Sequence, residues 1–140
     1  MAVVVLDAGH GGSDLGATYQ GRQEKDDTLA LTLAVGRLLA ENPDIDVVYT
    51  RGTDVYDTPL VKARKANAAN ADYFVSIHRN STPVPSTYSG VETLVYSKGT
   101  LAETLARNIA SALSAIGFAD LGTTAVSYTH LRAHETKANL

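Results

Sequence analysis

The chain has 140 residues, the length of one ordinary domain, which is enough to bury a hydrophobic core without disulfides. Its hydrophobic fraction of 44% and charged fraction of 19% are typical of globular proteins and exclude disorder over the whole length. A net charge of -3 without a basic stripe argues against a nucleic-acid partner. The absence of cysteine excludes disulfides, thiolate metal sites and cysteine nucleophiles.

The first half of the chain predicts a strand, a glycine-rich turn, a helix and a second strand. Val3 to Leu6 is a continuous apolar run, typical of a strand buried on both faces, and residues 7–12 contain three glycines that allow a tight turn. A helix is expected from about Lys25 until Asn42-Pro43, and residues 47–49 predict the next strand. The apolar face expected on this helix consists of Leu31, Val35, Leu38 and Leu39.

The second half predicts a helix, two strands and a last helix. Thr58-Pro59 is typical of a helix start, and the alanine-rich helix is expected to reach about Ala71. Residues 73–77 predict a third strand that ends at His78, and residues 91–96 alternate as a fourth strand does. Thr100 and Glu103 form a capping box for the last helix, which Gly117 is expected to end. Its apolar face is expected to consist of Leu101, Leu105, Ile109, Leu113 and Ile116.

This order of elements predicts an α/β fold with a mixed, mostly parallel central sheet flanked by helices. We find no internal repeat and no domain linker. No apolar run approaches the roughly 20 residues of a membrane span, so no membrane partner is expected. The N-terminus enters a strand at once and shows no secretion signal. The densest basic cluster (Lys62, Arg64 and Lys65) is predicted to be a solvated helix face.

Two histidines follow strands at one edge of the predicted sheet. His10 comes after the first strand and His78 after the third, and ligands of open α/β sheets bind beyond the carboxyl ends of the strands. Two histidines, one carboxylate and a water form a common catalytic zinc site. Glu24 lies just before the first helix and is a candidate for the third ligand. Other carboxylates compete with it by position alone: Asp7, Asp14, Asp26 and Asp27.

Each of these residues also has an ordinary structural interpretation. A single histidine after a strand is more often a hydrogen-bonding loop residue than a metal ligand. Glu24 is suited to the positive end of a helix dipole, and Asp7 is expected to cap the glycine turn through nearby backbone groups. The residues taken one at a time therefore leave the metal site open.

Three sequence blocks resemble the signature blocks of the zinc-dependent N-acetylmuramoyl-L-alanine amidases. The blocks are residues 5–12 (VLDAGHGG), 24–26 (EKD) and 76–80 (SIHRN), and their order and spacing also match. The similarity covers roughly residues 2–122, including Tyr49-Thr50-Arg51 and Gly90-Val91-Glu92. One block would be a weak signal, whereas three in register are specific.

The resemblance implies a function and a set of site residues. The family's metal ligands fall on His10, Glu24 and His78, with Zn²⁺ as the cofactor, and Arg79 and Asn80 are predicted to bind substrate. The implied reaction is hydrolysis of the amide between N-acetylmuramic acid and L-alanine in peptidoglycan. The implied partner is the glycan strand with its stem peptide, and the implied place of action is the cell wall, in the extracellular or periplasmic space. No protein partner is evident.

One block of the family is absent from this sequence. The family's general base is a glutamate late in the domain, in a block resembling Val-Glu-Val-Gly-Phe, so the catalytic base of this chain is unknown and weak or no activity is expected. Glu92 is the alternative, although a glutamate on an alternating strand is usually exposed to solvent. Without the late block, the last strand and helices of the family's fold are expected to be missing.

From about Val126 the sequence departs from the family and resembles the translation of a transposon adapter. We therefore expect residues 1–125 to be the N-terminal part of the catalytic domain and residues 126–140 to be a non-native tail. His130, His134 and Glu135 in this tail do not form the zinc-protease pattern and are not expected to bind metal.

Two other functions are alternatives to this interpretation. A zinc carboxypeptidase-like hydrolase would use the same ligand set on a different bond. A wall-binding module without catalysis would need neither the zinc nor the general base.

Overall fold

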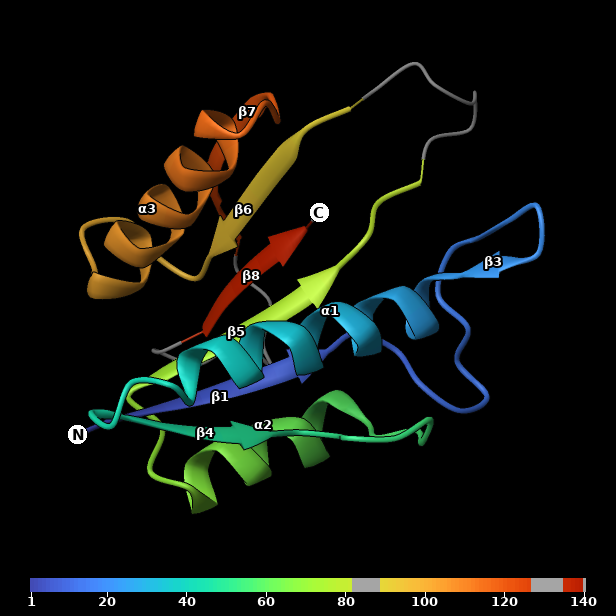
Figure 1. Cartoon of the computed structure of the whole chain (residues 1–140), viewed down its shortest axis with the longest axis horizontal. Helices are drawn as coiled ribbons and strands as arrows, with labels where there is room; N and C mark the ends of the chain where they lie inside the picture. Colours follow the sequence, from blue (N-terminus) through green and yellow to red (C-terminus); the bar gives the residue numbers. More distant parts are fainter. Residues whose placement is uncertain (82–88, 127–134, 140) are drawn as a thin grey trace.

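The computed structural model describes residues 1–81, 89–126 and 135–139, with side chains up to residue 126. Its main feature is a six-stranded sheet in the order β4-β1-β5-β8-β6-β7, beside a two-stranded hairpin of β2 and β3 (Figure 1). The strands of the large sheet are β1 (Ala2–Ala8), β4 (Ile45–Tyr49), β5 (Tyr73–His78), β6 (Val91–Val95), β7 (Asp120–Ala125) and β8 (Glu135–Asn139). The hairpin consists of β2 (Thr18–Tyr19) and β3 (Arg22–Gln23). Only β6 and β8 pair antiparallel within the large sheet, so the predicted mixed, mostly parallel architecture is confirmed.

Local sequence signals explain where the three helices among the described residues start. Helix α1 (Glu24–Leu39) carries acidic residues in its first turn, which complement the positive end of the helix dipole. Helix α2 (Pro59–Ala68) starts with proline, and the Thr58 side chain accepts a hydrogen bond from the backbone N–H of Val61. In α3 (Leu101–Ala115) the Thr100 hydroxyl accepts from the N–H of Glu103, which confirms the predicted helix start.

The helices cover the two faces of the sheet. On one face, Leu6, Val75 and Ile77 form a core cluster with Val35 of α1 and Leu105 of α3. On the other face, Val5 and Phe74 pack against Ala66 of α2. Successive residues of β1 and β5 thus point to opposite sides, and their continuous apolar runs reflect a sheet that is buried on both faces.

The helical faces predicted from leucines and isoleucines are partly wrong. In α1 the buried stripe is Thr28, Thr32 and Gly36, while the Leu38 side chain is 67% exposed. In α3 the buried stripe is made of alanines, Ala102, Ala106 and Ala110. Small side chains let these helices approach the sheet closely, and their larger apolar neighbours lie at the edges of the contact or in solvent.

The C-terminal part of the sheet contains two strands that the sequence pattern did not predict. Strand β7 pairs parallel with β6, and the backbone of β8 lies between β5 and β6. The predicted boundary at residue 125 and the origin of residues 126–140 stay predictions. His130 and His134 lie outside the described residues. Within the part of the chain that the structure describes, no helix has the length and apolar character needed to cross a membrane.

Candidate metal centre

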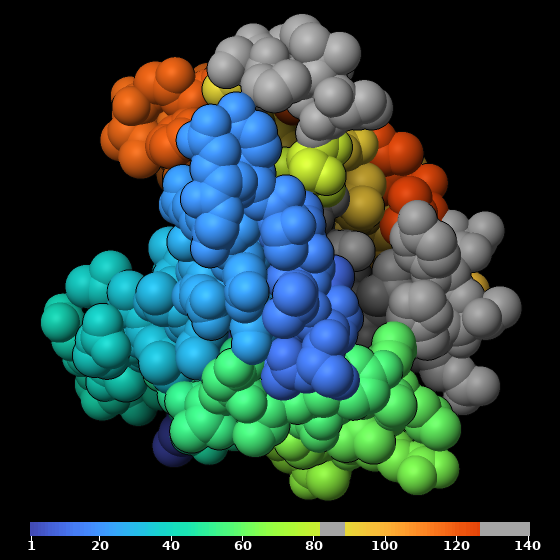
Figure 2. Space-filling view, turned by 90° about the vertical axis from the view of Figure 1, so that its right-hand side faces the viewer, coloured from blue at the N-terminus to red at the C-terminus, as the bar shows by residue number. Residues whose placement is uncertain are grey.

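The candidate site lies where β1, β4 and β5 end, on the side of the molecule that faces the viewer in Figure 2. In this view the blue loop after β1 lies between the green segment after β4 and the yellow-green end of β5. Because parallel strands end at the same edge of a sheet, loops that are far apart in sequence meet here.

His10, Glu24 and His78 converge at this edge. The Nε2 atom of His10 lies 3.0 Å from Oε1 of Glu24, and the Nδ1 atom of His78 lies 3.1 Å from the same oxygen. The two imidazole nitrogens are 3.2 Å apart. All three side chains therefore direct one potential ligand atom at a common point.

The spacing of these atoms fits one zinc ion. Ligand atoms at about 2.0 Å from a tetrahedral zinc lie about 3.3 Å from one another, close to the three separations found here. Two imidazoles and a carboxylate also form a donor set that zinc prefers, with a fourth position left for water. Among the described residues, no other group of histidine, cysteine and acidic side chains shows this convergence.

Glu24 is held as an ionised carboxylate by its surroundings. Burial favours a higher pKa, but hydrogen bonds from His78 and from the backbone N–H groups of Ala17 and Arg79 outweigh it and lower the pKa of Glu24 to about 2. The carboxylate is therefore charged and oriented, as a metal ligand must be.

Asp14 orients His10 from the other side of the imidazole ring. Its Oδ2 atom lies 2.8 Å from Nδ1 of His10, while the Gly16 backbone N–H donates to its Oδ1 atom. An acidic partner on the second ring nitrogen directs the first nitrogen toward the metal and raises its basicity. The candidate ligand His10 also has a φ of 63°, a left-handed conformation that is uncommon outside glycine.

Two glycines leave room for the candidate ligands. A Cβ atom on Gly9 would lie 2.5 Å from Cε1 of His78. A Cβ atom on Gly16, which has a φ of +65°, would lie 2.6 Å from Cδ2 of His10 and 2.7 Å from Oε2 of Glu24. The absence of a side chain at these two positions thus allows the three ligands to come together.

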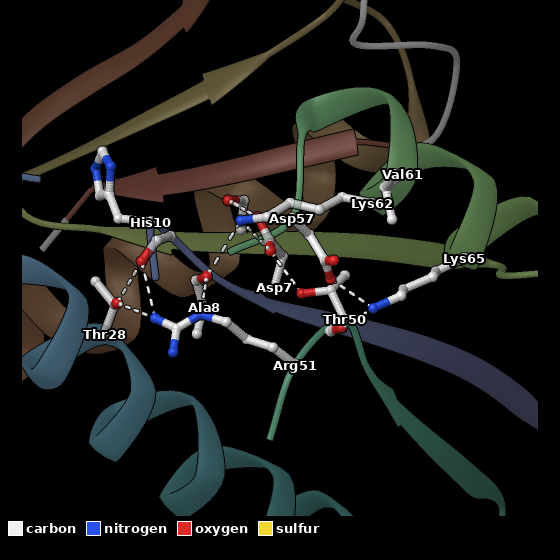
Figure 3. A network of polar contacts seen from close by, with 12 residues as sticks. Asp7, Ala8, His10, Thr28, Thr50, Arg51, Asp57, Val61, Lys62 and Lys65 are labelled. Carbon is white, nitrogen blue, oxygen red and sulfur yellow. Dashed lines mark hydrogen bonds and ion pairs between the residues drawn. The ribbon is translucent and has the colours of Figure 1, made fainter. Parts of the chain in front are cut away.

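A buried polar network supports the strands that carry the site (Figure 3). The Asp7 carboxylate accepts hydrogen bonds from the hydroxyls of Thr50 and Ser76, both at 2.6 Å, and pairs with the Lys62 ammonium at 2.8 Å. Burial favours a higher pKa for Asp7, but Lys62 and the two hydroxyls outweigh it and lower the pKa. The predictions that Asp7 caps the glycine turn and that Lys62 belongs to a solvated face are therefore wrong.

Arg51 connects this network to the loop that carries His10 (Figure 3). Its guanidinium is buried and donates to the carbonyl oxygens of Ala8 at 3.1 Å and of Gly9 at 3.1 Å. A further hydrogen bond of 2.9 Å to the carbonyl of Lys25 ties the start of α1 to the same side chain. Arg51 thus joins the backbone next to His10 with the backbone next to Glu24.

The two residues predicted to bind substrate occupy different surroundings. The Arg79 side chain pairs with Asp27, and its backbone N–H donates to Oε1 of Glu24 at 2.9 Å. The Asn80 amide lies 3.4 Å from Oε2 of Glu92 at the exposed end of β5. The half-buried Glu92 therefore contacts Asn80, and nothing in this contact identifies it as the catalytic base.

The competing carboxylates have other roles. Asp7 belongs to the buried network, Asp14 orients His10, Asp26 is exposed and Asp27 pairs with two arginines. The sequence offered no signal for the roles of Asp14 and Arg51, because both depend on contacts between separate loops.

Comparisons with known proteins agree with this geometry. The family model for N-acetylmuramoyl-L-alanine amidase matches residues 4–140. An endolysin of Bacillus phage SPP1 is 48% identical over 81 residues, which cover 58% of this chain and 30% of the endolysin. The sporulation-specific N-acetylmuramoyl-L-alanine amidase of Bacillus subtilis is 36% identical over 135 residues, which cover 94% of this chain and 51% of that amidase.

Solved structures show the same fold. An N-acetylmuramoyl-L-alanine amidase from Clostridium difficile superposes with a TM-score of 0.89 at 31% identity, covering 98% of this chain and 77% of that structure. The catalytic domain of CwlV, an amidase from Bacillus (Paenibacillus) polymyxa, gives a TM-score of 0.86 at 32% identity. The match covers 99% of this chain and 79% of that structure.

The chain spans about half of the Bacillus subtilis relative and about a third of the phage endolysin. The family match nevertheless includes most of β1, all of β5 and the three residues that converge at their carboxyl ends. The chain therefore belongs to the N-acetylmuramoyl-L-alanine amidase family.

Proposed function

We propose that this chain provides the zinc-binding part of an enzyme that hydrolyses the amide between N-acetylmuramic acid and L-alanine in peptidoglycan. The observation that carries this proposal is the convergence of His10, Glu24 and His78 at the spacing of zinc ligands. Family membership supports the choice of bond, since the same metal ligands serve hydrolases of several specificities. The whole protein would then act at the cell wall, in the extracellular or periplasmic space.

The residues of the site contribute to this function in different ways. A zinc ion bound here would supply a Lewis acid and a water whose pKa is near 7. His10, Glu24 and His78 would hold the ion, and Asp14 would maintain the orientation of His10. Arg79 and Asn80 lie at the end of β5, next to His78, where a substrate bound at the metal would contact them. The general base is a further requirement, and we propose that it is not Glu92, whose carboxylate contacts Asn80.

The proposal is tested by the products that the zinc-loaded chain releases from purified muropeptides, with a longer relative as the positive control. The expected products are peptides with a new N-terminal alanine. Release of single C-terminal amino acids would instead indicate a carboxypeptidase. Binding to sacculi that persists in a chelator, without any cleavage, would indicate a binding module.

Replacing Asp14 with alanine is expected to weaken zinc binding by about 10- to 100-fold, the usual effect of removing a hydrogen-bond partner of a metal-binding histidine. Without the contact between Asp14 and Nδ1, the His10 ring is free to rotate away from Glu24. Zinc competition with a fluorescent chelator measures this change, and Asp26→Ala, an exposed acidic residue in α1, is the control. Equal zinc affinity of the Asp14 and Asp26 variants would show that Asp14 does not orient the ligand.

A further inference from the structure

A pocket of about 340 Å³ adjoins the candidate zinc site on the side of His78. Its wall includes Leu31 of α1 and Ile77 of β5, and its rim carries Arg22, Asp27 and Arg79. The pocket therefore combines an apolar wall with two cationic side chains, directly beside one of the metal ligands.

The two arginines share a single acidic partner. The Nε atom of Arg22 lies 2.8 Å from Oδ2 of Asp27, and the guanidinium of Arg79 contacts the same oxygen. Two positive charges against one negative charge leave the rim with an excess of one positive charge. The Arg22 side chain is 65% exposed, so a ligand can reach it from solvent. Each guanidinium has five N–H donors arranged to match a carboxylate. The contacts with Asp27 use only some of these donors on Arg22 and Arg79.

The surroundings of the other histidine show no such excess of positive charge. Asp14 contacts His10 directly, and the exposed Asp54 accepts from the nearby backbone N–H of Gly12. Lys25 pairs with Asp54 at 2.6 Å, and the buried Arg51 guanidinium donates to the carbonyl of Gly9, so these two cations balance the two aspartates. A substrate that spans the zinc site and carries a carboxylate at one end would thus be attracted toward His78 rather than toward Asp14.

The backbone of Arg79 is anchored beside the candidate metal ligands. It follows His78 in sequence, and its backbone N–H donates to Oε1 of Glu24. A carboxylate bound by its guanidinium would consequently be positioned relative to the bond at the zinc site, which is the requirement for a specificity residue.

We propose that Arg22 and Arg79 form the subsite for the first carboxylate of the stem peptide, the one on the glutamyl residue that follows the alanine. This inference rests on the proposed function, and it places the peptide on the His78 side of the metal and the glycan on the His10 side. The partly exposed Leu31 in the pocket lining would then contact the aliphatic part of the glutamyl residue.

Binding of three synthetic peptides to the metal-free chain, measured by calorimetry, tests the proposal. All have the sequence L-alanyl-γ-D-glutamyl-L-lysine. The first has a free glutamyl carboxylate and an amidated C-terminus, the second has the reverse, and the third has both groups amidated. We expect the first peptide to bind about tenfold more tightly than the third, as for one charge-assisted pair, and the second to bind like the third. Equal binding of the first and third peptides, or no detectable binding of either, overturns the proposal. Tighter binding of the second peptide alone would also overturn the proposal.

Single-residue variants identify which side chains bind the glutamyl carboxylate. Arg22→Gln and Arg79→Gln should each remove most of the discrimination between the first and third peptides. Arg107→Gln, which changes an exposed arginine paired with Glu103 on α3, should keep all of it. Asp27→Asn should strengthen binding of the first peptide, because the arginines lose their internal partner. Loss of discrimination in Arg107→Gln to the same extent, or weaker binding of the first peptide by Asp27→Asn, contradicts the assignment.

The outcome is separable from that of the proposed function. Zinc affinity and the identity of the hydrolysis products test the metal site, whereas peptide discrimination is measured without metal and without turnover. A chain that binds zinc and releases the expected peptides, yet does not distinguish the first peptide from the third, would retain the proposed function and lose only this subsite.

Discussion

Replacing His78 with alanine is expected to weaken zinc binding by more than about 100-fold, which exceeds the usual effect of losing an outer hydrogen-bond partner of a ligand. The physical reason is that Nδ1 of His78 is one of three atoms that converge on the candidate ion position. His10→Ala and Glu24→Ala should have the same effect, and any hydrolysis should disappear with the zinc. Equilibrium dialysis with metal analysis measures the stoichiometry and affinity.

The matched control for Glu24 is Asp26→Ala, since Asp26 is an exposed acidic residue on the same helix. It should bind one zinc ion with unchanged affinity. Stoichiometric zinc with unchanged affinity in all three ligand variants would show that the ion binds elsewhere.

Lys62→Met is expected to lower the free energy of unfolding by about 3 to 5 kcal/mol, the typical cost of removing one partner from a buried ion pair. Lys62 is 9% exposed and Asp7 is 3% exposed, so the variant leaves a carboxylate in the core with only two hydroxyl partners. Chemical denaturation followed by circular dichroism measures the change. The exposed Arg64→Met on the same helix is the control, and we expect an effect within about 0.5 kcal/mol.

The pH dependence of the destabilisation by Lys62→Met gives a second check. In the wild-type chain the pKa of Asp7 is lowered below 3.8, so the stability that its charge provides is present above that value and is lost as the pH falls through the folded-state pKa. In Lys62→Met the burial of Asp7 is no longer offset by the ammonium, and its folded-state pKa should rise. The destabilisation should therefore be largest near neutral pH and shrink under acid. If Lys62→Met and Arg64→Met lowered the free energy of unfolding equally, this would contradict the stabilising role of the Lys62–Asp7 pair.

The sequence predicted the elements that surround the site because their signals are local. The apolar runs of β1 and β5, the proline at the start of α2 and the capping threonine of α3 each act within a few residues. The two histidines could be placed at one edge of the sheet for the same reason, since each follows a strand. The choice of Glu24 over four aspartates depended on the family resemblance.

The remaining features depend on contacts between distant segments. Lys62 is buried because Asp7, on a different element, offers it a partner in the core. The buried stripes of α1 and α3 consist of small residues because the helices lie close to the sheet, which hydrophobic periodicity alone does not reveal. The pairing of Arg22 and Arg79 on Asp27 joins three segments and has no sequence signature.

The most direct test of the metal site is a crystal structure of the zinc-soaked chain with anomalous data collected on both sides of the zinc absorption edge. We predict one strong zinc peak at about 2.0 to 2.2 Å from Nε2 of His10, Nδ1 of His78 and a carboxylate oxygen of Glu24. A zinc peak that contacts fewer than two of these side chains, or no peak at this edge of the sheet at saturating zinc, would contradict the assignment.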